Sequence, residues 1–115
     1  FVPIPLSSKR YRKRGYNQAE ILAKGLSKKF GFEIVNGLDR VKETRSQVGL
    51  TKKERKENVM GAFALKKKFE NSLENRNVVL IDDVLTTGST FSEAGSILKR
   101  NGATKVWAIA FAREQ

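Results

Sequence analysis

The chain has 115 residues, with 23 Lys and Arg against 12 Asp and Glu and a formal net charge of +11. This length is typical of one compact domain. The sequence contains no cysteine and no histidine, which excludes disulfides, thiol chemistry and mechanisms that need a histidine base. Any chemistry must therefore use carboxylates, hydroxyls, lysine and arginine, and the metal that suits them is a hard cation such as magnesium.

The positive charge predicts a polyanionic partner, either nucleic acid, a phosphate-rich metabolite or an anionic membrane surface. The alternative is a basic surface that serves only solubility. The sequence shows neither an apolar run of membrane-spanning length nor a signal-peptide pattern, so we expect no membrane insertion. Its opening residues, "FVPIPLSS", begin inside a predicted strand without a methionine, so we expect further residues upstream.

The first third predicts a short strand, a basic loop and a helix. Pro3 and Pro5 indicate an irregular or edge strand over residues 1–6. Asn17 is the expected cap of a helix, with Glu20 in a capping box, and Gly31 is its expected end. The apolar face of this helix is predicted to contain Ala19, Leu22, Ala23, Leu26 and Phe30.

The middle third predicts less regular structure. Residues 32–38 indicate a short strand and turn, and residues 61–65 indicate another strand. The polar segment 39–58 predicts a loop followed by one or two helical turns after Thr51. Residues 66–77 predict a charged surface connection.

The final third predicts a strand–helix–strand unit. Residues 77–82 are a continuous apolar run that is typical of a buried parallel strand. Residues 89–102 predict a helix with Phe91, Ala94, Ile97 and Leu98 toward the core and Gly102 as its stop, and residues 105–112 predict a second apolar strand. We therefore expect an α/β fold with a central parallel sheet flanked by helices, formed by residues 1–115 as a single domain.

Two adjacent acids, Asp82 and Asp83, come at the end of the first of these strands, within "VVLIDDVLTTGST". In open α/β sheets ligands bind beyond the carboxyl ends of the strands. The loop that follows offers backbone N–H groups, hydroxyls and the start of a helix, which together predict a phosphate site. Nucleotide motifs with several glycines or a lysine do not match here. The alternative is a helix capped by Ser89 or Thr90 after a strand that happens to end in aspartates.

Carboxylates beside a phosphate site need a partner that they attract. Vicinal sugar hydroxyls donate hydrogen bonds to carboxylates, and a magnesium ion can bridge carboxylates to phosphate. Both partners occur together in a ribose phosphate that carries pyrophosphate.

Residues 78–90 resemble the phosphoribosyl-pyrophosphate (PRPP) motif of the type I phosphoribosyltransferases over its full length. The wider chain resembles the ComF/GntX family, the competence-associated branch of that superfamily. The resemblance is carried by "VPIPLSSKRYRKRGYNQAEILAKGL", by the pattern R-x-x-x-T-x-x-Q-x-x-L-x-x-x-x-R-x-x-N from Arg40 to Asn58, by "GAF" at 61–63 and by the tail "NGATKVWAIAFAR". Members of this family typically carry an amino-terminal cysteine-rich element, which is missing from these residues.

The resemblance implies a role for each matching segment. Asp82 and Asp83 would hold the ribose hydroxyls, directly or through Mg²⁺, and would be the catalytic and metal residues. The PRPP-binding loop would consist of Thr86, Thr87, Gly88, Ser89 and Thr90. The pyrophosphate loop would consist of Ser7, Ser8 and Lys9. The mobile loop that covers the reacting centre would include Thr44, Arg45 and Gln47.

Two functions from different classes remain open. One is a cytoplasmic enzyme that transfers the phosphoribosyl group of PRPP to an unidentified acceptor in a DNA-uptake-related role. The other is a non-catalytic module that senses PRPP or binds single-stranded nucleic acid, alongside other DNA-uptake proteins. The basic patch of Arg10, Arg12, Lys13 and Arg14, interrupted by Tyr11, suits a polyphosphate or single-stranded DNA, since aromatic rings among cations stack on bases.

Overall fold

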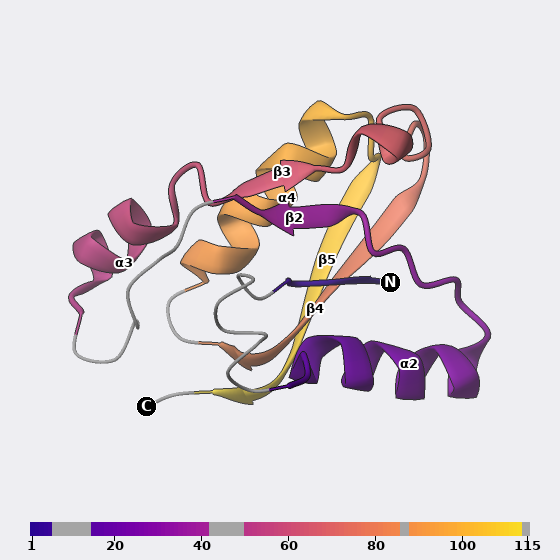
Figure 1. Cartoon of the computed structure of the whole chain (residues 1–115), viewed down its shortest axis with the longest axis horizontal. Helices are drawn as coiled ribbons and strands as arrows, with labels where there is room; N and C mark the ends of the chain where they lie inside the picture. Colours follow the sequence, from indigo (N-terminus) through magenta and orange to yellow (C-terminus); the bar gives the residue numbers. More distant parts are fainter. Residues whose placement is uncertain (6–14, 42–49, 86–87, 114–115) are drawn as a thin grey trace.

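The computed structural model describes residues 1–5, 15–41, 50–85 and 88–113. The helices and strands formed by these residues are shown in Figure 1, coloured along the sequence. They are β1 (Val2–Pro3), α2 (Gln18–Phe30), β2 (Leu38–Arg40), α3 (Lys52–Val59), β3 (Phe63–Leu65), a 3₁₀ turn (Lys67–Phe69), β4 (Asn77–Leu85), α4 (Ser89–Arg100) and β5 (Lys105–Arg113).

The main sheet is parallel and has the strand order β1–β4–β5. Its central strand β4 pairs with β1, placing Pro3 opposite Ile81, and with β5, placing Asp82 opposite Ala110. A separate antiparallel ribbon joins β2 to β3, with Arg40 opposite Phe63. The α/β fold with a central parallel sheet between helices is therefore confirmed (Figure 1).

The two faces of the sheet are covered by different helices. Side chains alternate along a strand, so Leu80 and Ile81 of β4 point to opposite faces. Leu80 points toward α4, since its side chain would lie 3.7 Å from a Cβ on Gly95. Helix α2 contacts β4 and β1, and it lies across the sheet from α4 in Figure 1.

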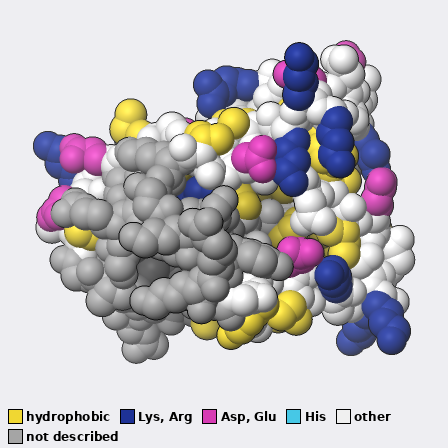
Figure 2. Space-filling model, viewed as in Figure 1, with side chains coloured by type: hydrophobic (Ala, Val, Ile, Leu, Met, Phe, Trp, Pro, Cys, Tyr) yellow, Lys and Arg dark blue, Asp and Glu magenta, His cyan; other side chains and the backbone are white. Residues whose placement is uncertain are grey.

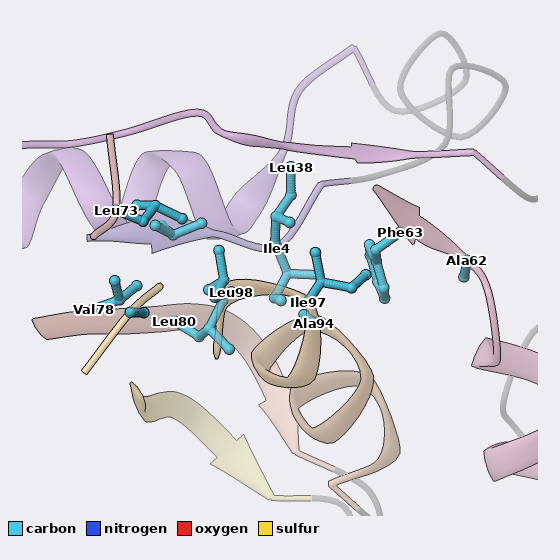
Figure 3. Packing of buried hydrophobic residues seen from close by; sticks show 12 residues of the cluster. Ile4, Leu38, Ala62, Phe63, Leu73, Val78, Leu80, Ala94, Ile97 and Leu98 are labelled. Carbon is cyan, nitrogen blue, oxygen red and sulfur yellow. The ribbon is translucent and has the colours of Figure 1, made fainter. Parts of the chain in front are cut away.

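The hydrophobic core lies on the α4 side of the sheet and also takes in the β2–β3 ribbon. Phe63 from β3 lies beside Ile97 and Ala94 of α4 in the close-up of Figure 3. The same cluster contains Leu38 from β2 and Leu80 from β4. The ribbon is therefore fixed to the main body by apolar packing, not only by its own hydrogen bonds.

Helix α2 begins at the predicted cap and ends at the predicted glycine. The Asn17 side chain accepts a hydrogen bond from the Ala19 backbone N–H at 3.0 Å, and Gly31 has the left-handed φ of 78° that favours glycine. The predicted apolar face was wrong at Phe30, which is 57% exposed. This residue is the last of the helix and extends beyond the part that α2 buries against the sheet.

Strand β5 forms where expected, but it is not buried on both faces. Val106 packs against the core, whereas Trp107 and Phe111 are each about half exposed. Both point to the α2 face of the sheet, because Val79, opposite Trp107, alternates with Leu80. Helix α2 packs on β4 and β1, which leaves this face of β5 to solvent.

Two strand boundaries also differ from the sequence prediction. The strand expected within residues 32–38 forms only at Leu38 and continues to Arg40. Strand β4 continues to Leu85, beyond the predicted end at residue 82, so both acids lie inside the strand. Pairing with β5 extends through Leu85 and Arg113 and keeps the backbone extended past the acids. In the part of the chain that the structure describes, no helix has the length and apolarity to cross a membrane.

We predict that Asn17→Ala destabilises the protein by about 1–2 kcal/mol, because it removes a helix cap and a hydrogen bond to the core. Besides capping α2, the Asn17 amide donates to the Ile4 carbonyl oxygen at 3.0 Å, which ties the helix start to the end of β1. Urea unfolding measures the loss. The matched control is Thr51→Ala, which removes only the cap of the exposed helix α3. An equal loss in both variants would contradict the second role of Asn17.

Candidate functional site

The two acids lie at the carboxyl end of the sheet, where parallel strands present ligand sites. Asp82 and Asp83 are half-buried in β4, and the neighbouring strand β1 ends at Pro3, opposite Ile81. The acids therefore follow directly beyond the paired part of β1. The Asp83 backbone N–H donates to the Asp82 carboxylate at 2.8 Å, which orients that carboxylate.

Several opposing effects act on the pKa of Asp82. Burial, followed by the side-chain hydrogen bond with Asp83, raises the pKa of Asp82 to about 7. The backbone N–H of Asp83 and the positive charge of Arg40 oppose this rise in the pKa of Asp82. At neutral pH a fraction of the molecules thus carries a proton on Asp82, and a ligand that needs the ionised carboxylate must displace it.

Helix α4 begins at Ser89, four positions after β4 ends at Leu85, and its amino terminus faces the same end of the sheet. Its cap is Gly88, whose φ of 82° is left-handed, as expected for a glycine that lets the backbone turn sharply. The alternative expectation, that Ser89 or Thr90 caps the helix, is wrong, because both residues lie inside its first turn. The first N–H groups and the positive end of the helix dipole suit a phosphate.

The β2–β3 ribbon brings one residue to the site that the sequence did not assign to it. Arg40 lies with its guanidinium carbon 5.0 Å from the centre of the Phe63 ring, and its charge acts on Asp82. In the sequence, Arg40 is only the first residue of a family pattern. The sequence places Arg40 near the start of the polar segment 39–58, and this position does not reveal a residue 42 positions later as its neighbour.

Arg40 lines a pocket of about 400 Å³ between the end of β1, the start of α2 and the β2–β3 ribbon. Its lining is mostly polar. It is formed by Pro3, Pro5, Asn17, Glu20, Asn36, Leu38, Asp39, Arg40, Val41 and Lys66.

The remaining candidates fall outside the described residues. These are the pyrophosphate-loop residues Ser7, Ser8 and Lys9, the basic patch of Arg10, Arg12, Lys13 and Arg14, the mobile-loop residues Thr44, Arg45 and Gln47, and the loop residues Thr86 and Thr87. Their roles stay predictions. Among the predicted residues, the structure brings Asp82 and Asp83 to the same end of the sheet as Gly88, Ser89 and Thr90.

The acid pair fits magnesium that arrives with a phosphate ligand. Within residues 1–5, 15–41, 50–85 and 88–113, histidine, cysteine and acidic side chains do not form a group of three or more that could hold a metal by themselves. Magnesium is commonly held by only one or two carboxylates together with substrate phosphates. Asp82 and Asp83 are a donor set of this kind.

The carboxyl end of a parallel sheet is where open α/β proteins bind ligands, and here it presents two acids and a helix start. Comparison with known families agrees: the family model "Phosphoribosyl transferase domain" matches residues 12–115. The chain belongs to this family, and the resemblance to the type I phosphoribosyltransferases of the ComF branch is confirmed.

The relatives of this chain have names connected with DNA uptake and use. It is 40% identical over 112 residues to Competence protein F of Haemophilus influenzae, covering 95% of this chain and 48% of the relative. It is 37% identical over 114 residues to the DNA utilization protein YhgH of Escherichia coli strain K12, covering 94% and 47%. It is 36% identical over 101 residues to Competence protein ComFC of Bacillus subtilis, covering 88% and 38%. The chain thus spans about half the length of these relatives or less.

We predict that Asp82→Asn stabilises the protein at high pH and not at low pH. Folding raises the pKa of Asp82 from its ordinary value of 3.8 to about 7. The protonated Asp82 carboxyl therefore stabilises the folded state fully below pH 3.8. This stabilisation is lost as the pH rises through 7. Asparagine resembles the protonated acid in shape and does not titrate. At pH 8 the variant should exceed the wild type by at least ~1.4 kcal/mol, the equivalent of one pKa unit.

The measurement is urea unfolding of both proteins at pH 4, 6 and 8. The two stabilities should converge at pH 4, where Asp82 is protonated in the folded wild type. A difference that stayed constant over this range would contradict the raised pKa.

Proposed function

We propose that this protein binds PRPP together with Mg²⁺ and transfers its phosphoribosyl group to an acceptor, in a role connected with DNA uptake. The observation that supports this most is the pair Asp82 and Asp83 in β4, at the carboxyl end of the sheet and a few positions before Gly88 and the start of α4. This arrangement offers carboxylates to sugar hydroxyls and helix N–H groups to a phosphate within one short segment. Membership in the phosphoribosyl transferase domain family supports the same ligand.

The reaction requires charge stabilisation more than acid–base chemistry. The bond between the ribose C1′ and the pyrophosphate oxygen breaks, and its electron pair leaves with the oxygen. The acceptor donates a lone pair to C1′ and loses its proton to solvent. A chain without histidine suits this reaction, because the main tasks are to orient the ribose and to stabilise the negative charge of the leaving group.

Each described residue has a distinct task in this scheme. Asp82 and Asp83 accept hydrogen bonds from the ribose hydroxyls and orient C1′, and Asp82 must first lose its proton. The amino terminus of α4 binds the 5′-phosphate through its N–H groups and the positive end of its dipole. Asp82 and Asp83 would hold the magnesium ion, which would neutralise negative charge on the pyrophosphate.

We predict that Asp83→Asn abolishes Mg²⁺-dependent binding of PRPP and leaves the unfolding free energy within about 0.5 kcal/mol of the wild type, as for a substitution that removes no core contact. The change keeps the shape of the side chain and removes the charge that attracts hydroxyls or a cation. Calorimetric titration of PRPP, with and without Mg²⁺, measures the affinity.

The matched control for this test is Glu33→Gln, which removes an exposed acid that pairs with Arg76 near the amino end of β4, away from the acid pair. It should bind PRPP as the wild type does. If Asp83→Asn kept wild-type affinity for PRPP, the proposed ribose site would be wrong.

A second candidate is binding of single-stranded nucleic acid, which the net charge of +11 and the names of the relatives favour. On the face seen in Figure 2, Lys and Arg side chains of the described surface are spread out, with acidic side chains among them. The densest run of cations in the sequence is instead at residues 9–14, where five of six residues are basic.

We predict that replacing Arg10, Arg12, Lys13 and Arg14 together with glutamine weakens single-stranded DNA binding and reduces its salt dependence. Each lost phosphate contact should lower the slope of log K against log[salt] by about 0.7 for a single strand. Fluorescence anisotropy with a labelled oligonucleotide at several salt concentrations measures both quantities. If the slope is unchanged, the basic run is a solvated surface segment. If DNA binding is lost and PRPP binding persists, the two ligands have separate sites.

A further inference from the structure

We propose that one face of β5 is a docking surface for an amphipathic helix that lies outside these 115 residues. The surface is formed by the side chains of Trp107, Ile109 and Phe111, which are 51%, 39% and 50% exposed. We call it the β5 face. These three residues have no task in the PRPP reaction as proposed above, so this inference does not depend on the proposed function.

The β5 face continues a face of the sheet that is otherwise buried. Its three residues occupy alternate positions, so their side chains point to the same side of the sheet. In the register of the two strands, Trp107 lies opposite Val79 and Ile109 lies opposite Ile81. Ile81 has no exposed surface, whereas Ile109 beside it is 39% exposed. Burial of this face therefore ends between two neighbouring strands.

Strand β5 has the sequence of a strand that is covered on both faces. Parallel strands with both faces covered are continuous apolar runs, and residues 106–112 contain no charged or polar side chain. In the described sheet, β5 is an edge strand. Exposed edge strands usually carry charges that prevent unwanted pairing. Because residues 106–112 lack such charges, their sequence suits a strand that another element covers.

Helix α2 borders the β5 face with an apolar side chain. Successive helical residues are about 100° apart around the axis, so Glu20 and Leu22 lie on opposite flanks of the buried Ala19 and Ala23. The flank of Glu20 lines the pocket beside β1. The flank of Leu22 therefore points the other way, toward β5, and Leu22 is half-buried.

The space beside α2 has the dimensions of a second helix. Packed helices lie about 8–10 Å apart, which is about two spacings between neighbouring strands. Helix α2 packs on β1 and β4, so a helix next to it would lie over β5. One side of such a helix would contact the β5 face, and its flank would contact Leu22. It would complete the helical layer on this side of the sheet.

The charges around the β5 face specify the flanks of the docking helix. Lys105 is exposed at the start of β5. Lys29 is exposed on the same flank of α2 as Leu22, because it follows Leu22 by seven residues, or two helical turns. Opposite charges across an interface favour the right partner. We therefore expect a helix that is apolar on one side and carries aspartate or glutamate along its edges.

A second copy of this chain does not suit the β5 face. Its three side chains expose about 300 Å² in total, whereas a standard interface buries about 800 Å² of each partner. If β5 paired in antiparallel order with its own copy around Ile109, Lys105 would stand opposite Arg113. Like charges in such a position are destabilising. Each copy also carries a net charge of +11.

The relatives contain enough additional chain to supply the helix. Competence protein F of Haemophilus influenzae is matched over 48% of its length, and YhgH of Escherichia coli strain K12 over 47%. About half of each relative therefore lies outside the match. A helix within the same polypeptide needs only a small contact area, because the covalent connection keeps its effective concentration high. We therefore assign the β5 face to a helix of this unmatched part.

Hydroxyl-radical footprinting tests the proposal, because mass spectrometry then measures how exposed individual side chains are. Two proteins are compared: this chain, and a chimera in which the unmatched part of Competence protein F is joined to this chain in the order of that relative. Oxidation of Trp107 and Phe111 should fall about fivefold or more in the chimera, as expected when half-exposed side chains enter a packed interface. Met60 at the end of α3 is 57% exposed, and its oxidation should be equal in both proteins.

A charge at the centre of the β5 face tests whether the contact is apolar. In the chimera, Ile109→Lys should return the oxidation of Trp107 to within about twofold of its value in this chain alone, because burial of an unpaired lysine is costly. The matched control, Met60→Lys, adds the same charge where α3 packs against α4, and it should leave Trp107 protected. The unfolding midpoint of each variant is measured alongside. If Ile109→Lys does not fold, the comparison of the two unsubstituted proteins carries the test.

Three outcomes would overturn the proposal in different ways. If Trp107 and Phe111 are oxidised equally in the chimera and in this chain, no helix of the unmatched part covers them. If this chain alone sediments as a dimer in which Trp107 is already protected, the occupant is a second copy. If a single-stranded oligonucleotide protects Trp107 in this chain, the surface binds nucleic acid instead of a helix. Each result leaves the PRPP titrations, and with them the proposed function, unaffected.

Discussion

The pairing of β4 on both of its edges is the constraint on which the rest of the structure depends. Strand β5 pairs with β4 along most of its length, and β1 pairs with it at Leu80 and Ile81, in the middle of the strand. Its side chains then alternate between the α2 face and the core beneath α4. The same strand continues without interruption into Asp82 and Asp83. The rigidity of the sheet is thereby transmitted to the two carboxylates, whose positions relative to β1 and α4 are set by the sheet and not by a loop.

This rigidity has a cost in electrostatic free energy. Burial is the largest cause of the raised pKa of Asp82, and the neighbouring side chain of Asp83 raises it further. A protein selected only for stability would favour amides or hydroxyls at these positions. Strained or destabilised groups of this kind concentrate at sites of function. The acid pair becomes favourable only when a cation or a donor of hydrogen bonds approaches it, which makes the unliganded site receptive to a hydroxyl-rich or metal-bound ligand.

Helix α4 connects the acid pair to the β2–β3 ribbon that carries Arg40, and it does so through packing in the hydrophobic core. It follows β4 directly, so its amino terminus lies beside the acids, while Ala94 and Ile97 pack against Phe63 of the ribbon. The ribbon would otherwise be a small two-stranded unit with little stability of its own. Because it shares the core with α4, the side chain of Arg40 is anchored to the same body as the acids. The hydrophobic core thus determines the arrangement of charges around the site.

The sequence by itself determined the local structure and the family. The Asn17 cap of α2, the end of that helix at Gly31 and the strand–helix–strand unit of the final third all depend on neighbouring residues, and they form as predicted. What the sequence could not show depends on contacts between distant segments. Arg40 meets Phe63 and Asp82 only because the ribbon folds onto α4. The apolar run of residues 105–112 predicted a strand but not its exposure, and Trp107 is half exposed because exposure depends on which strands α2 covers. Periodicity specifies which side chains share a face, whereas only the tertiary structure decides what lies against that face.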